Sequence, residues 1–250
     1  MDLRLVATGI AMVGTSFGLA RYGYGLLLPD MRASFHLSNA ALGAIATGSY
    51  AAYLAGTGCL AAVTGRLPSW QPVAAGGLFA VVGMLLVAIA GSPFVLAVGV
   101  LIAGASAAFA YPPFADAVAE RIPEQRQGRV LALISSGTGW GVALAVAIAL
   151  IAASSWRTAW VEFAAVGALS TVAAVIVLRR GRRATTDPDP LPPLSWSWFV
   201  CPRSGPLLVG ALLVGHRRGL HALQQMRAAE ARRLRNTAQR LVQQPALHFR

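Results

Sequence analysis

The sequence predicts an all-α membrane protein with six transmembrane helices and a basic tail. Of its 250 residues, 56% are hydrophobic and only 12% are charged, about half the charged share of a soluble domain. The apolar residues gather in stretches long enough to cross a hydrocarbon core about 30 Å thick. We predict spans at about 5–28, 40–63, 73–90, 93–111, 130–153 and 158–178.

The first span carries a single charge, Arg21, about two thirds of the way along. An arginine inside a membrane costs about 2.5 kcal/mol or more, so it normally faces a protein interior or a wet cavity. On a regular helix Gly14, Gly18 and Gly25 share its face. We therefore expect a glycine-lined groove that ends at Arg21. The alternative is that Arg21 lies near the outer end and extends to the headgroups.

The arginines are shared unevenly between the two ends of the predicted bundle. Only Arg32 and Arg157 fall on one side. The other side has nine arginines: Arg4, Arg66, Arg121, Arg126, Arg129, Arg179, Arg180, Arg182 and Arg183. Cytoplasmic loops are enriched in arginine and lysine. Both ends of the bundle are therefore expected in the cytoplasm, with the lipid bilayer as the main partner.

Polar side chains from different spans are predicted at similar depths in the membrane. The second span places Thr47, Tyr50 and Tyr53 near its centre, and the fifth places Ser136, Thr138 and Trp140 there. We expect them to line one cavity; ordinary helix packing is the alternative. Glu162 is a candidate ion-pair partner for Arg21, or is simply hydrated at the interface. The predicted substrate-binding residues are Arg21, Tyr24, Tyr50, Thr138 and Trp140.

Composition argues against several other functions. The net charge of +12 comes from 21 arginines and no lysine, and many of these arginines flank apolar spans, so nucleic acid is not an expected partner. Cys59 and Cys201 form neither a disulfide framework nor a metal site, and no cofactor is expected. None of the four histidines lies in a span. No serine or cysteine has a base nearby, so we do not expect an enzyme.

The first and fourth spans end alike, with a tyrosine followed by proline and aspartate. The first runs from Tyr24 to Asp30, and the fourth from Tyr111 to Asp116. The likeness would place them at equivalent positions in two three-helix repeats, which are typical of secondary transporters.

Two connections resemble those of the major facilitator superfamily of secondary transporters. Residues 58–66, GCLAAVTGR, are similar to its G-x-L-A-D-R-x-G-R loop, with Gly58, Gly65 and Arg66 in place. Residues 119–129, AERIPEQRQGR, resemble its P-x-x-x-R-G-R-A connector through Arg126, Gly128 and Arg129. The resemblance implies that these six residues belong to cytoplasmic gating loops.

The sequence also departs from that pattern at two functional positions. Ala62 stands where the family has a gating aspartate, and Val100 stands where it often has an arginine in the fourth span. Residues 17–24, FGLARYGY, resemble a first-span signature of one bacterial branch with drug, sugar or organic-anion relatives. This resemblance implies the bacterial cytoplasmic membrane as the location.

Beyond the sixth span the pattern changes. Residues 181–204 read as a cytoplasmic linker, and a seventh apolar run at 205–215 is too short to cross a membrane. Residues 216–250 hold eight arginines and one acid. They form either an amphipathic basic helix on an anionic membrane or, as we favour, the product of a shifted reading frame or truncation.

Two functions from different classes remain. The favoured one is secondary transport of an unknown small polar or anionic solute, by a half-transporter that is incomplete and inactive alone. It would then need self-association or a missing second half. The alternative is an integral membrane protein that does not transport and acts through helix association.

Overall fold

The computed structural model describes residues 2–63, 67–152 and 155–181, all within the unit Met1–Pro190. The sequence-based expectations for Gly65 and Arg66, for the linker, for the seventh run and for the basic tail lie outside them. The described residues form helices and no strand. The all-α fold is therefore confirmed for this part of the chain.

Five helices among the described residues are long and apolar enough to cross a membrane. They are Leu3–Leu26, Trp70–Ala88, Pro93–Arg121, Glu124–Ile151 and Trp156–Arg180. Helix α4, Asn39–Val63, has 25 residues and no charge. Its glycine, serine, threonine and tyrosine residues lower its hydropathy, so α4 is not among the five. The count of six spans stays a prediction.

The first predicted span is not one regular helix. It consists of α1 (Leu3–Val13), the π-helical segment η1 (Gly14–Arg21) and α2 (Gly23–Leu26), and α3 (Leu28–Phe35) follows. The fourth span is also interrupted, because α6 (Pro93–Ala105) passes into a 3₁₀ turn, η2 (Ser106–Phe109), before α7 (Pro112–Arg121). Both irregular segments lie beside the cavity described below.

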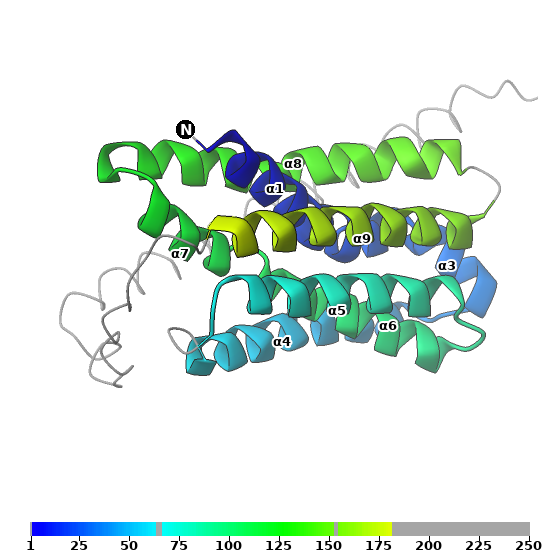
Figure 1. Ribbon diagram of the computed structural model, residues 1–250. Helices are drawn as coiled ribbons and strands as arrows, with labels where there is room; N and C mark the ends of the chain where they lie inside the picture. The colour runs from blue at the N-terminus through cyan, green and yellow to red at the C-terminus, as the bar shows by residue number, and fades with distance from the viewer. Residues whose placement is uncertain (1, 64–66, 153–154, 182–250) are drawn as a thin grey trace, which may run out of the picture. The chain divides into compact units, whose positions relative to one another are not determined.

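The remaining helices are α5 (Trp70–Ala88), α8 (Glu124–Ile151) and α9 (Trp156–Gly181). Helix α5 packs against α6 and α9, α4 packs against α6, and α1 and η1 pack against α8. Figure 1 shows α4, α5, α6, α8 and α9 running alongside one another, with α3 near one end and α7 near the other. This arrangement surrounds the first span with other helices.

Glycines bring the first span into backbone contact with α8. A methyl group added at Gly18 would overlap the backbone of Gly141, and one added at Gly137 would overlap the carbonyl of Ile10. Small residues permit this close approach. The sequence predicted that Gly14, Gly18 and Gly25 would form a groove leading to Arg21, and this prediction was wrong. Gly14 and Gly18 pack on α8, and Gly25 has open space around it.

The π-helical turn explains the difference. Its i→i+5 hydrogen bonds make each turn wider than the 3.6-residue turn of an α-helix. Residues 14, 18 and 21 therefore do not remain on one face. The two glycines turn toward α8, while Arg21 turns toward α4.

At one end of the bundle Arg157 holds three elements together. Its Nη1 donates to the carbonyls of Ala88, at 3.1 Å, and Ala90, at 2.6 Å, which close the end of α5. Its guanidinium lies 4.3 Å from the ring centroid of Trp156, whose indole nitrogen donates to Ser34 Oγ of α3 at 2.9 Å. One predicted outer arginine thus satisfies carbonyls that the helix leaves unpaired.

Candidate functional site

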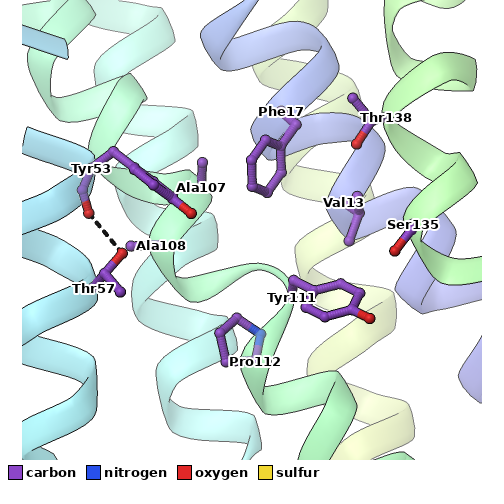
Figure 2. A pocket seen from close by; sticks show the side chains of 10 residues that line it. All are labelled: Val13, Phe17, Tyr53, Thr57, Ala107, Ala108, Tyr111, Pro112, Ser135 and Thr138. Atoms are coloured by element: carbon purple, nitrogen blue, oxygen red, sulfur yellow. Dashed lines mark hydrogen bonds between the residues drawn. The ribbon is translucent and has the colours of Figure 1, made fainter. Parts of the chain in front are cut away.

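A cavity of about 250 Å³ lies between the interrupted first span, α4, η2 with the start of α7, and α8. Figure 2 shows side chains entering it from all four directions. The lining residues are Val13, Phe17, Tyr53, Thr57, Ala107, Ala108, Tyr111, Pro112, Ser135 and Thr138. Three aromatic rings and five hydroxyl groups therefore surround one space.

The irregular segments determine which side chains reach this space. The 3₁₀ turn places Ala107 and Ala108 at the wall, and Pro112 begins α7 directly below it. A proline lacks a backbone N–H, so it suits a helix start. These small residues leave room that larger side chains would fill. The predicted end of the fourth span, at about Tyr111, thus lies at the cavity.

Arg21 lies beside the cavity and contacts two of its lining residues. Its guanidinium carbon is 4.4 Å from the ring centroid of Tyr53 and 5.8 Å from that of Phe17. It is also 4.2 Å from the ring centroid of Tyr50. The negative face of each ring attracts the cation. The charge of Arg21 is therefore held by aromatic side chains of α4 and of its own helix.

The guanidinium is not fully satisfied by these contacts. Its Nε is buried and has no hydrogen-bond partner. Glu162, the carboxylate proposed from the sequence as an ion-pair partner, is not joined to Arg21 within the part of the chain that the structure describes. Of the two alternatives for Glu162, the ion pair with Arg21 is therefore wrong, because Arg21 points toward α4 and Glu162 belongs to α9.

The residues predicted from the sequence to bind substrate are only partly brought together. Thr138 lines the cavity, and Tyr50 contacts Arg21 next to it. Tyr24 is buried elsewhere and donates from its hydroxyl to the Leu42 carbonyl at 3.2 Å. Trp140 is 70% exposed and lies outside the lining. Ser136, also outside the lining, donates to the Leu133 carbonyl at 2.7 Å.

The sequence placed Tyr53 at the expected cavity but not among the substrate-binding residues, and it did not place Phe17, Tyr111 or Ser135 there. A signal existed for each of them. Tyr53 lies near mid-span, Tyr111 precedes the prolines, Phe17 is four residues before Arg21, and Ser135 adjoins the glycine-rich stretch of α8. These sequence positions alone do not determine which face of each helix points into the bundle.

The predicted gating residues that the structure describes lie in helices and not in loops. Gly58 is in α4, and Arg126, Gly128 and Arg129 are in the first turns of α8. The connection before α8 is short, and Gln127 Nε2 ties it down by donating to the Ile122 carbonyl at 2.9 Å. Helix α8 begins at Glu124, before the predicted span start at 130, because a helix can extend beyond the apolar part of a span.

A polytopic helical bundle with a polar, solute-sized cavity between its spans defines an integral membrane protein of the transporter class. The chain belongs to the Major Facilitator Superfamily, whose pattern matches residues 10–222. No curated protein matches the chain. The family expected from the two connections is thus confirmed, and with it a membrane transporter of this type.

Proposed function

We propose that the chain takes part in secondary transport of a small polar or anionic solute, which binds in the cavity between the first, second, fourth and fifth spans. The observation that carries the proposal is the convergence of hydroxyl-bearing side chains from these elements on one cavity. Sites between inward-facing helices near mid-span are typical of secondary transporters.

Two chemical classes of solute are served by this arrangement. For an anionic solute, Arg21 supplies a fixed positive charge, and its planar fork of donors suits a carboxylate or phosphate. For an uncharged polar solute, the hydroxyls of Ser135 and Thr138 supply hydrogen bonds. We place Arg21, Tyr50 and Thr138 in or beside the site on these grounds.

The cytoplasmic membrane of a bacterium, with both ends of the bundle in the cytoplasm, remains our proposed location.

A thermal-shift screen of the purified full chain tests this function. A solute that binds only the folded protein, at a free concentration 100 times its Kd, raises the free energy of unfolding by about 2.7 kcal/mol. We expect at least one small polar or anionic solute to raise the melting temperature, and Thr138→Val to reduce that shift. If no solute of either class shifts the transition, the protein is better explained by the alternative, a membrane protein that only associates with other helices.

A further inference from the structure

Two arginines and a tryptophan join the ends of three candidate spans at one end of the bundle. Helix α5 begins at Trp70, α7 ends at Arg121, and α9 carries Arg179 in its last turn. The Nη2 of Arg121 donates to the Leu178 carbonyl at 3.1 Å. The guanidinium carbon of Arg179 lies 4.7 Å from the ring centroid of Trp70. Figure 1 shows this end of α9 beside α7.

Both guanidinium groups are held in place and keep free donors. A guanidinium has five N–H donors in one plane. Arg121 uses one of its Nη donors on the carbonyl of Leu178, which α9 leaves unpaired at its end. Arg179 is held by the ring of Trp70 and makes no hydrogen bond within the described residues. Glu120, beside Arg121, is exposed, and no carboxylate pairs with either arginine in the described part of the chain. Two positioned positive charges therefore remain available to an anion.

An exposed apolar stripe runs along α9 to these arginines. Its residues recur at intervals of three and four: Leu169, Val172 and Ile176, which are 73%, 58% and 43% exposed. Arg179 continues the same spacing and is also exposed. In a membrane, acyl chains cover such a stripe, and an arginine at its end reaches the depth of the headgroups. One amphiphilic ligand therefore fits both the stripe and the charges.

The residue types at this end select the headgroup. The planar donors of arginine bind phosphate in pairs, and tryptophan is enriched at the level of the headgroups. Basic pockets between transmembrane helices bind anionic headgroups. A free phosphate would contact the arginines and leave the apolar stripe unused. A zwitterionic lipid carries an ammonium group, which the arginines repel.

We propose that an anionic phospholipid binds where α5, α7 and α9 meet. Its phosphate contacts Arg121 and Arg179, and one acyl chain lies along the stripe of α9. Trp70 is a positioning residue, because it holds the guanidinium of Arg179. The site shares no residue with the lining of the cavity, so it does not depend on the function proposed for that cavity.

Native mass spectrometry of the purified full chain in detergent tests the proposal. The probes are phosphatidylglycerol, which is anionic, and phosphatidylcholine with the same acyl chains, which is zwitterionic. We expect the Kd of phosphatidylglycerol to be lower by about fivefold or more, the contribution of at least one arginine near an anionic group. Glycerol phosphate, which has no acyl chains, should not bind at millimolar concentration. Equal affinity for the two lipids, or binding of glycerol phosphate as tight as that of the lipid, overturns the proposal.

Arg4 provides a matched control for Arg179. It is exposed and lies in the first turn of α1, at the same end of the bundle, because its neighbour Leu5 belongs to the same buried cluster as Leu178. Arg179→Gln should weaken the binding of phosphatidylglycerol by about fivefold. Arg4→Gln removes the same charge and should leave the Kd unchanged. Equal losses in the two variants would show a general attraction between charges and contradict a site.

Arg121 needs a second measurement, because Arg121→Gln also removes a hydrogen bond to the end of α9. The melting temperature of this variant is therefore measured without lipid and with phosphatidylglycerol. We expect a lower melting temperature without lipid and a smaller rise on addition of the lipid than in the unaltered chain. A rise as large as that of the unaltered chain would show that Arg121 only caps α9 and would remove it from the site.

Discussion

Arg21 is an energetically costly residue for this bundle. An arginine at membrane depth costs about 2.5–3.5 kcal/mol on insertion scales. Its contacts with the rings of Tyr50 and Tyr53 return about 0.5–2 kcal/mol. No carboxylate within the described residues compensates the remainder. A cost of burial larger than the energy of the contacts is expected where a charged residue is kept for function and not for stability.

We therefore predict that Arg21→Leu stabilises the protein by roughly 0.5–3 kcal/mol, the difference between these two terms. Arg21→Lys should instead destabilise it, because the compact ammonium loses the planar contact with the rings and keeps the charge. Denaturant unfolding in detergent followed by the near-ultraviolet signal measures both. A less stable Arg21→Leu protein would mean that the arginine is a structural residue.

Individual residues also show what the sequence could and could not predict. The charge of Arg21 and the polarity of Thr138 were sufficient to select both residues, because such groups are rare inside spans. Tyr24 and Trp140 have the same polarity, yet one is bonded to Leu42 and the other faces outward. Residue type indicates that a group needs a partner, but the rotation of the helix decides which partner it meets.

The contact between the first span and α8 depends on glycine at particular positions. Gly14 and Gly18 meet Gly141 so closely that a side chain on Gly141 would overlap the carbonyl of Gly14. Gly139 lies two residues earlier on α8, and a methyl group added there would meet no atom of a neighbouring element within 4 Å. Gly139 therefore serves as a matched control for Gly141.

Gly141→Ala is predicted to destabilise the bundle by about 1–3 kcal/mol through overpacking. Gly139→Ala should be neutral or stabilising by up to about 1 kcal/mol, because alanine favours helix more than glycine. Comparison of the two melting temperatures checks this directly. Equal stability of both variants would contradict the glycine contact.

Arg157 offers a second test on the scale of elements. Its hydrogen bonds to the Ala88 and Ala90 carbonyls are charge-assisted, and each bond of this kind contributes about 1.5–3 kcal/mol. Arg157→Gln should lower the free energy of unfolding by about 2 kcal/mol or more. Arg32→Gln removes an exposed arginine on α3 and should leave stability unchanged. If Arg32→Gln costs as much, the loss reflects net charge and not the α5 contact.

Among the secondary-structure elements, the long helices were predicted from the sequence and the π-helical segment was not. The apolar stretches predicted the long helices well, since length and hydropathy are properties of composition. The π-helical segment over Gly14–Arg21 was missed, because counting by three and four assumes a regular α-helix. Its wider turn changes which residues share a face, and the predicted groove was lost for that reason.

On the scale of the whole molecule, the arginine bias predicts the topology. Reporter fusions placed after Arg32 and after Arg183 should report opposite compartments, with the second in the cytoplasm. Replacing Arg179, Arg180, Arg182 and Arg183 with neutral residues should loosen this orientation. Both reporters in one compartment would show that the number of spans between them is even and not odd, which contradicts six spans.

The last prediction is that this chain, reconstituted alone, does not accumulate solute. Alternating access in this class of transporter moves one bundle against another around a site at their interface, and the structure describes one bundle. Polar groups beside its cavity are open, with Tyr50 54% exposed and the hydroxyls of Tyr53, Tyr111, Ser135 and Thr138 unpaired within the described residues. Lipid would leave such groups unsatisfied, so this side needs a second bundle or a second copy of the chain.

Proteoliposomes that contain only the purified chain should therefore show no uptake above that of protein-free vesicles, even of a solute that stabilises the chain in a thermal-shift screen. A vesicle preparation with an unrelated complete transporter would verify that the imposed gradient is intact. Accumulation against a gradient without an added partner would overturn this prediction. A symmetric dimer, in which each copy covers the cavity side of the other, would then be the mechanism to test, by crosslinking a cysteine at the exposed position of Tyr50.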